Sequence, residues 1–289
     1  MKSGFVAIIG RSNVGKSTLL NKIIGEKISI VTPKKQTTRD AIQGIYNDED
    51  SQIIFIDTPG IHKAKSELGT RMDKAAYSSL RSAELALLVV DASVPFDAGD
   101  EYLLDHLNFD CDVIVVLNKI DETNVVLVEE LKDRYSKKQG VIAIIETVAT
   151  EGFNVKELIE LIKKNLDEGP QYYDVDVVTD STLNFRIQEI VREKMLLCLK
   201  EEVPHSSTVI CQKVDFDDNP PNVFIKIIVE KESQKGIVIG KHGSMIKKIG
   251  MRARQDIERM MGRHVNLDTT VQVYENWRNS PKFLNKKRE

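Results

Sequence analysis

Short apolar runs alternate with longer amphipathic stretches through the first 168 residues of the chain. The apolar runs predict strands over residues 2–9, 41–46, 51–56, 85–91, 112–117 and 141–146. Apolar residues at helical spacing predict helices over residues 17–24, 67–80 and 155–166. This alternation indicates an α/β domain over residues 1–168, with a mostly parallel sheet, helices on both faces and ligand-binding loops at the carboxyl ends of the strands.

The pattern changes after residue 168. Residues 169–180 contain a Gly-Pro pair and several acidic residues, which predict a linker. Beyond it the pattern predicts a helix over 182–201, strands over 208–216 and 223–229, helices over 235–239 and 244–261, and a strand over 265–274. We therefore expect a small α+β domain over residues 181–279, followed by a flexible basic tail over 280–289.

Composition is that of an ordinary soluble protein, but charge separates the two parts of the chain. Residues 1–180 carry 21 Lys+Arg against 30 Asp+Glu, whereas residues 181–289 carry 20 against 14. Only the second part is suited to binding a polyanion, and its surplus is concentrated in residues 231–263, with 9 basic and 3 acidic residues. With no long apolar run and no cationic leader, we expect a cytoplasmic protein, and we expect a monomer.

A glycine-rich segment joins the first predicted strand to the first helix and satisfies the pattern G-x-x-x-x-G-K-[ST]. Its residues are Gly10, Arg11, Ser12, Asn13, Val14, Gly15, Lys16 and Ser17, with Thr18 next in the helix. Backbone N–H groups and the helix dipole favour a phosphate there, Lys16 supplies a mobile ammonium, and the Ser17 hydroxyl can bind Mg²⁺. The alternative is a glycine-rich connection with an incidental lysine, which the flanking strand and helix disfavour.

Two further segments fit a site for the γ-phosphate. The polar, proline-interrupted stretch over 27–40 predicts a mobile loop, and its Thr38 can reach a Mg²⁺-bound phosphate, although a threonine pair is also common in turns. The strand over 51–56 leads into Asp57, Thr58, Pro59 and Gly60. Asp57 can hold Mg²⁺ and the Gly60 N–H can approach the phosphate, whereas a plain turn is the alternative. The neighbouring His62 is expected to be exposed and mobile.

The base preference comes from the segment after the strand over 112–117, which reads Asn118, Lys119, Ile120 and Asp121. The Asp121 carboxylate can accept from the N1–H and the amine of guanine, whereas adenine offers no matching donors. Asn118 and Lys119 can brace the base and its loop. The loop after the last strand contains Val148, Ala149 and Thr150, and we assign it to the same site.

In the second domain a Gly-x-x-Gly loop lies between two predicted helices. The candidate RNA-binding residues are Lys235, Gly240, Lys241, His242, Gly243, Lys247 and Lys248. The glycines let the backbone approach a nucleotide strand, while lysines and helix N-termini contact phosphates. The spacing alone is weak evidence, and a solvated basic helix is the alternative. The order helix-strand-strand-helix-helix-strand resembles a type II KH domain, which implies binding of single-stranded RNA.

These motifs together resemble the translation-factor-type GTPases and, more closely, the Era GTPases of bacteria, which join such a P-loop domain to a C-terminal KH domain. The likeness covers almost the whole chain. It implies that Lys16, Thr38 and Gly60 are catalytic, that Ser17, Thr38 and Asp57 bind Mg²⁺, and that residues 118–121 read guanine. The sequence departs from the family at Val148, where serine is usual, and at Ser12, where proline is commoner.

A glutamine that orients the attacking water follows the Asp-x-x-Gly motif in many GTPases, but here that residue is Ile61. In related GTPases without the glutamine, an asparagine at the position of Asn13 helps to hold K⁺ against the phosphates. We therefore expect Asn13 to be a K⁺ ligand, with capping of its own loop as the alternative.

The expected function is a GTP-hydrolysing switch that binds small-subunit (16S) ribosomal RNA and assists assembly of the small ribosomal subunit, the RNA target being implied by the Era resemblance alone. Its alternatives are a GTP-gated RNA-binding module with incidental hydrolysis and a membrane-associated signalling GTPase. The cationic tail is the feature that favours a peripheral membrane contact.

Overall fold

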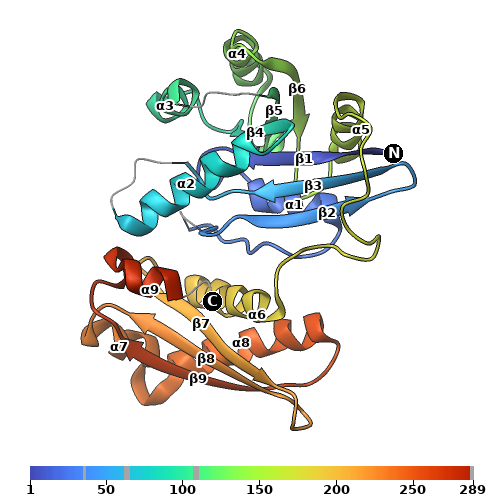
Figure 1. The fold of residues 1–289 in the computed structure, drawn as a ribbon. Helices are drawn as coiled ribbons and strands as arrows, with labels where there is room; N and C mark the ends of the chain where they lie inside the picture. Colours follow the sequence, from blue (N-terminus) through green and yellow to red (C-terminus); the bar gives the residue numbers. More distant parts are fainter. Residues whose placement is uncertain (35–36, 62–65, 107–110, 287–289) are drawn as a thin grey trace. The chain divides into compact units, whose positions relative to one another are not determined.

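The computed structural model describes residues 1–34, 37–61, 66–106 and 111–286. Contacts between residues divide the chain into two compact units (Figure 1). The first comprises residues 1–65 and 69–180, and the second comprises residues 66–68 and 181–289. His62 and the last three residues of the predicted tail lie outside the described residues.

The first unit is a six-stranded sheet flanked by helices. The strands lie in the order β2-β3-β1-β4-β5-β6, and every neighbouring pair is parallel except β2 with β3. The elements are β1 (Lys2–Ile9), α1 (Lys16–Ile24), β2 (Ile42–Asn47), β3 (Ser51–Asp57), α2 (Glu67–Arg81), β4 (Leu85–Asp91), α3 (Ala98–His106), β5 (Asp112–Asn118), the 3-10 turn η1 (Ile120–Glu122), α4 (Val125–Ser136), β6 (Val141–Thr147) and α5 (Val155–Asn165).

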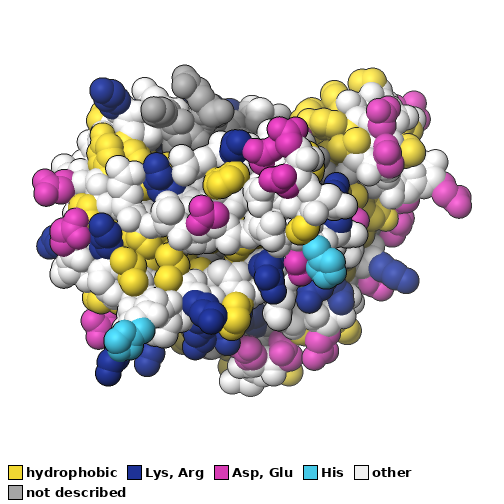
Figure 2. Space-filling view, turned by 90° about the horizontal axis from the view of Figure 1, so that it is seen from below, with side chains coloured by type: hydrophobic (Ala, Val, Ile, Leu, Met, Phe, Trp, Pro, Cys, Tyr) yellow, Lys and Arg dark blue, Asp and Glu magenta, His cyan; other side chains and the backbone are white. Residues whose placement is uncertain are grey.

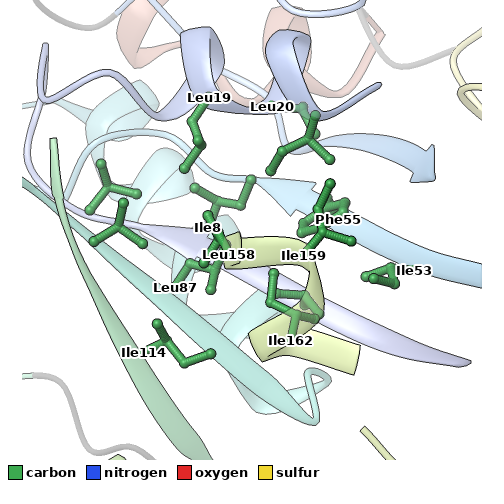
Figure 3. Close-up of a cluster of buried hydrophobic side chains, with 14 of the residues drawn as sticks. Ile8, Leu19, Leu20, Ile53, Phe55, Leu87, Ile114, Leu158, Ile159 and Ile162 are labelled. Atoms are coloured by element: carbon green, nitrogen blue, oxygen red, sulfur yellow. The ribbon is translucent and has the colours of Figure 1, made fainter. Parts of the chain in front are cut away.

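Helices cover both faces of this sheet, as the alternation of strands and helices predicts. On one face, α1 and α5 pack their leucines and isoleucines against Ile8, Phe55, Leu87 and Ile114 of the strands (Figure 3). On the other face, α2, α3 and α4 contribute to a second cluster that includes Ile9. Strands buried on both sides account for the continuous apolar runs in the sequence. Because β1, β3, β4, β5 and β6 are parallel, their carboxyl ends lie at one edge of the sheet.

Two helices of this unit, α3 and α4, are not evident from the apolar pattern. Helix α4 begins with Val125 and Val126, whose exposed fractions are 77% and 69%, so these valines obscure the buried face that Val128, Leu131 and Tyr135 form. Asn124 caps it by accepting from the backbone N–H of Leu127 at 3.0 Å. In helix α3 the larger apolar residues, Tyr102, Leu103 and Leu104, are consecutive in the sequence, so they show no helical period.

The second unit packs helices against a three-stranded sheet of order β7-β8-β9, in which β7 and β8 are antiparallel and β8 and β9 are parallel. Apolar residues of α6, α7 and α8 form one core with the strands. The elements are α6 (Leu183–Cys198), β7 (Thr208–Asp215), β8 (Asn222–Val229), α7 (Glu232–Ile239), η2 (Lys241–Gly243), α8 (Ser244–Met261), β9 (Asn266–Val273), η3 (Trp277–Asn279) and α9 (Pro281–Lys286).

The bounds of three segments in the second unit differ from the sequence-based prediction. Helix α7 begins at Glu232, before the predicted residue 235, because Gln234 accepts from the backbone N–H of Lys231 at 3.1 Å and stabilises an earlier start. Helix α6 ends at Cys198, because Leu199 already has an extended backbone. The predicted flexible tail is wrong for Pro281–Lys286, which form α9. Leu284 is buried beside Trp277, whose indole N–H donates to the Ser206 carbonyl at 2.8 Å.

The predicted linker is bound along the edge of the first unit. The backbone N–H of Ile45 in β2 donates to the Val178 carbonyl at 2.9 Å, and the Thr179 hydroxyl donates to the Gln43 carbonyl at 2.6 Å. These bonds occupy part of the free edge of β2, which would otherwise expose unpaired backbone groups. Among the described residues, no helix combines the length and the apolar composition that crossing a membrane requires.

Candidate nucleotide site and RNA-binding surface

The phosphate loop connects β1 to α1, and two of its glycines are required by close approach. Gly10 has φ 146° and a Cβ there would lie 2.3 Å from the Val89 carbonyl oxygen. Gly15 has φ 105° and a Cβ there would lie 2.2 Å from Nδ2 of Asn118. Side chains are excluded at both positions, so the loop can pack against the neighbouring strand ends with its backbone accessible to a phosphate.

Lys16 is the first residue of α1 and is only 6% exposed. Its ammonium donates to the carbonyls of Gly10 at 3.0 Å and Arg11 at 2.8 Å. Burial lowers the pKa of Lys16 to about 8, and the nearby Asp57 carboxylate opposes this shift. The two loop carbonyls hold the ammonium over the cavity. A phosphate oxygen can replace them as the acceptor.

Three oxygen-bearing side chains that the sequence assigned to Mg²⁺ lie together. The Ser17 hydroxyl is 3.0 Å from the Thr38 hydroxyl and donates to Oδ2 of Asp57 at 2.6 Å. Asp57 is fully buried, and desolvation raises its pKa although the Lys16 charge and two hydroxyl donors oppose the rise. Among the described residues, Oδ1 of Asp57 is buried without a hydrogen-bond partner. Hydroxyl and carboxylate oxygens with an unpaired buried acceptor fit a hard cation such as Mg²⁺.

Ser29 is a fourth member of this cluster, and no sequence motif predicted it. Its hydroxyl donates to Oδ2 of Asp57 at 2.8 Å, and the residue is fully buried. A serine in an irregular segment gives no local signal that it contacts a carboxylate 28 residues away. The segment over 27–40 has no helix or strand in its described residues, as expected, yet Thr38 is 7% exposed.

The segment after β3 approaches the phosphate loop closely. A Cβ on Gly60 would lie 2.7 Å from the Ser12 hydroxyl oxygen, so this position also requires glycine. Thr58 and Pro59 are buried, and the Thr58 hydroxyl donates to the Ile8 carbonyl at 2.8 Å. Ile61 is 5% exposed and belongs to the apolar cluster on the second face of the sheet. Its side chain cannot orient a water molecule.

A cavity of about 380 Å³ opens at this edge of the sheet. Asn13, with φ 68°, is one of its lining residues. Its Nδ2 donates to the Pro33 carbonyl at 2.8 Å, so the Asn13 amide binds the segment over 27–40. The N-cap of α1 is Gly15 and not Asn13. The lining residues are Ser12, Asn13, Gly15, Lys16, Ser17, Thr18, Ile30, Val31, Thr32, Pro33, Thr37, Thr38, Gly60 and Lys119.

Arg11 has a different environment from the other residues of the phosphate loop. Its side chain does not line this cavity, and its guanidinium pairs with Asp97 and Asp100 at 2.9 Å each. Asp100 lies in α3, a helix that the apolar pattern did not reveal. The sequence therefore identified Arg11 as part of the loop but missed the two carboxylates that hold its side chain.

The proposed base-reading segment is organised around Asn118. Nδ2 of Asn118 donates to the Val14 carbonyl at 2.9 Å, while Oδ1 accepts from the Ala149 N–H at 2.9 Å and the Thr147 hydroxyl at 3.2 Å. One amide therefore joins the phosphate loop to the loop after β6. Asp121 lies exposed in η1 and Thr150 is exposed after β6, so both are accessible to a ligand.

Asp91 and Val148 are neighbours of this segment, and no sequence motif predicted the role of Asp91. Asp91, at the end of β4, forms an ion pair with Lys119 and lowers the mobility of that ammonium. Val148 is 6% exposed, and its carbonyl accepts from the backbone N–H groups of Glu151, Gly152 and Phe153 at 3.1, 2.8 and 3.2 Å. Backbone bonds close the loop where a serine hydroxyl is usual in the family.

The Gly-x-x-Gly loop of the second unit joins α7 to α8 with its backbone in the left-handed region. Gly240 and Gly243 both have φ 75°, and His242 has φ 51°. A Cβ on Gly240 would lie 2.7 Å from Cβ of Met245, whereas Gly243 has open space around it. Lys241, His242, Lys247 and Lys248 are exposed and Lys235 is half-buried. Figure 2 shows lysine and arginine side chains gathered among exposed hydrophobic ones on the face that it presents.

A groove of about 550 Å³ runs beside this loop, between α8 and the strands β8 and β9. It combines basic side chains with apolar ones, a combination suited to phosphates and stacked bases. Of the residues that line this groove, only Lys247 was predicted from the sequence, because the strand residues come to line it only when the unit folds. The lining residues are Asn222, Phe224, Ile246, Lys247, Gly250, Met251, Arg254, Asn266, Leu267, Asp268 and Thr269.

Both units match families of known proteins. Residues 5–119 match the family described as 50S ribosome-binding GTPase, and residues 202–278 match the KH domain family. The chain is 47% identical over 290 residues to GTPase Era of Leuconostoc citreum (strain KM20), a match that covers 98% of this chain and 95% of that protein.

Two solved structures of Era proteins match the whole chain. An Aquifex aeolicus Era variant bound to GDP·AlF₄⁻ is 39% identical, with a TM-score of 0.93 and 99% of each chain covered. Era in complex with MgGDPNP and nucleotides 1506–1542 of 16S ribosomal RNA is 38% identical, with a TM-score of 0.93 and 99% and 98% of the two chains covered. The chain joins an α/β P-loop domain to a KH domain and is 47% identical to a GTPase Era over nearly all of its length. It belongs to the Era family of GTPases.

Proposed function

We propose that this protein is a GTP-hydrolysing switch that binds small-subunit (16S) ribosomal RNA through its KH domain and assists small-subunit assembly. The observation that carries the proposal is the presence in one chain of a P-loop site and a basic KH groove. The complex of a 38% identical Era with MgGDPNP and a 16S RNA segment supports both ligands.

The nucleotide is held at both of its ends. The backbone of residues 10–18 and the Lys16 ammonium bind the phosphates, because the loop amides and a buried positive charge favour a polyanion. Asp121 accepts from the N1–H and the amine of guanine. Asn118 keeps these two ends in register, since its amide bonds to Val14 in one loop and to Ala149 in the other.

Ser17, Thr38 and Asp57 are the residues that would hold Mg²⁺, because their oxygens already lie together around an unpaired buried carboxylate oxygen. When bound, the ion supplies positive charge that neutralises the phosphates during transfer. The chain orients the γ-phosphate through the N–H of Gly60 and the Lys16 ammonium.

Hydrolysis in this chain proceeds without a side chain that orients water, because Ile61 is apolar and buried. The backbone carbonyl of Thr38 is left to position the attacking water, because the γ-phosphate takes the N–H of Gly60. We also propose that Asn13 contributes to a K⁺ site. Its amide lies against the Pro33 carbonyl of the segment over 27–40, and amide and carbonyl oxygens are suitable ligands for such an ion.

The deciding experiment measures GTP turnover by the full chain with and without an RNA of nucleotides 1506–1542 of 16S RNA, RNA affinity in GTP and GDP, and retention on anionic vesicles. Turnover that the RNA stimulates, together with GTP-dependent RNA binding, would support the switch. RNA affinity that depends on GTP without any stimulated turnover would favour the GTP-gated binding module. Retention on anionic vesicles in preference to RNA would favour the membrane-associated GTPase.

A further inference from the structure

Ser29 is a fully buried serine in the irregular segment between α1 and β2, and no part of the GTPase sequence motifs includes it. Its hydroxyl donates to Oδ2 of Asp57 at 2.8 Å. A buried hydroxyl requires a partner, since leaving one unpaired costs roughly 1–3 kcal/mol. The partner of the Ser29 hydroxyl is the Asp57 carboxylate, which we assign to Mg²⁺.

The backbone of Ser29 is held by a single side chain from α1. Oδ1 of Asn21 accepts from the N–H groups of Ile28 at 3.0 Å and Ser29 at 2.9 Å, and Nδ2 donates to the Ser29 carbonyl at 2.7 Å. The flanking side chains of Ile28 and Ile30 are 7% and 3% exposed, so apolar packing holds both sides of the serine. Beyond them Val31 is 40% exposed. Ser29 is therefore an anchored point at the start of a more open segment.

The two oxygens of Asp57 are used differently. Oδ2 accepts from the hydroxyls of Ser17 and Ser29, while Oδ1 is buried without a hydrogen-bond partner among the described residues. If Ser17 turns its hydroxyl oxygen to Mg²⁺, Ser29 keeps Oδ2 and with it the rotamer of the carboxylate. Such support of a metal ligand by a neighbouring hydrogen bond typically changes metal affinity by about 10–100-fold.

We propose that Ser29, anchored by Asn21, is a positioning residue that orients the Asp57 carboxylate so that Oδ1 is presented to the nucleotide-bound Mg²⁺. The inference rests on the proposed Mg²⁺ site. It predicts that the Ser29 hydroxyl affects the dependence of nucleotide binding on Mg²⁺, and that nucleotide binding without the metal is insensitive to it.

The test titrates MgCl₂ against the full chain with a fluorescent, non-hydrolysable GTP analogue and compares the midpoint with affinity in EDTA. In Ser29→Ala we expect the Mg²⁺ midpoint to rise about tenfold, the low end of the range for such support, with affinity in EDTA unchanged. The matched control is Ser51→Ala. Ser51 is also fully buried, and its hydroxyl also donates to a carboxylate, Oδ1 of Asp48 at 2.7 Å, away from the phosphate loop.

The outcomes separate the two proposals. Ser17→Ala tests the Mg²⁺ site itself. If nucleotide binding by the parent does not depend on Mg²⁺, or if Ser17→Ala has the same Mg²⁺ midpoint as the parent, the site assignment fails. If Ser17→Ala weakens the Mg²⁺ effect while the midpoint of Ser29→Ala stays within about twofold of the parent, the role of Ser29 is overturned. Ser29→Cys keeps the volume and a weak donor, so it should fold if the alanine variant does not, and its midpoint should lie between parent and alanine.

Discussion

The nucleotide site and the RNA-binding surface of this protein bind phosphates by different physical means. In the nucleotide site, Lys16, Asp57 and Asn118 are 6%, 0% and 3% exposed and are tied by hydrogen bonds to neighbouring loops. On the KH surface, Lys241, His242, Lys247 and Lys248 are exposed beside an open groove. The buried, hydrogen-bonded side chains of the nucleotide site favour one ligand geometry, whereas the exposed charges of the KH surface can bind phosphates in many geometries.

This difference predicts which perturbations each region tolerates. A buried, hydrogen-bonded site loses heavily when one polar group no longer matches its ligand, because its partner is left unpaired. An exposed basic surface loses affinity in small increments for each phosphate contact, and its affinity falls steeply with salt. Nucleotide binding should therefore respond sharply to single substitutions, and RNA binding should respond gradually.

The largest effect is expected for base selectivity. Asp121→Asn exchanges an acceptor for a donor, so preference should move from GTP toward xanthosine triphosphate by up to roughly 10⁴-fold in the ratio of affinities. Competition binding measures the ratio. The matched control is Glu122→Gln, an exposed neighbour in the same 3-10 turn, which should leave it unchanged. Unaltered selectivity in Asp121→Asn would remove Asp121 from the guanine site.

A smaller loss is expected at the phosphate end. Lys16→Ala removes a charged donor worth about 3 kcal/mol, so GTP affinity or turnover should fall roughly 100-fold. Thermal unfolding should show a folded domain, because the Lys16 ammonium donates to two carbonyls of its own loop and so ties together no distant segments through these bonds. Lys137→Ala, which removes an exposed lysine from the same domain, is the control. Parent-like turnover in a folded Lys16→Ala would contradict the phosphate-loop assignment.

RNA binding should show the gradual response. Gly243 has open space around it, so Gly243→Asp adds negative charge near the approaching phosphates at the cost of a strained φ, and RNA affinity should fall about tenfold. Gly240→Asp should lose more, because its Cβ would also clash with Met245. Intrinsic GTP turnover should not change.

Gel shifts over a range of salt concentrations measure this affinity. Gly140→Asp is the control, since Gly140 has φ 86° and lies in the first unit. Survival of RNA affinity in both Gly243→Asp and Gly240→Asp would place the RNA elsewhere on the protein.

The smallest effect concerns the cation that accompanies hydrolysis. The parent protein should turn over faster in K⁺ than in Na⁺ at equal ionic strength, by a factor of about five if one charge at 4 Å contributes about 1 kcal/mol. Asn13→Ala should abolish the difference. Asn13→Gly separates backbone strain from ligand loss, because glycine adopts the φ of 68° freely. Equal parent rates in both salts would exclude the ion.

The sequence alone determined the features that depend on local order along the chain. The phosphate loop, the residues after β3 and β5, the Gly-x-x-Gly loop and the two-domain division were predicted because glycine spacing, apolar period and charge are readable within short windows. The same reading could not reveal α4, whose first two residues, Val125 and Val126, are exposed, or the helix in the tail, which is stabilised by burying Leu284 beside Trp277.

Tertiary structure decided which residues complete each site. Ser29 reaches Asp57 across 28 residues, Asp91 reaches Lys119 across 28, and Asn118 reaches Val14 across 104. Asp97 and Asp100 hold Arg11, and strand residues complete the RNA groove, in the same way. Contacts of this kind form only when parallel strands bring their ends to one edge or a helix packs on a sheet. A single sequence shows the motif residues that contact a ligand. The residues that orient them by hydrogen bonds and ion pairs are determined by packing between distant segments.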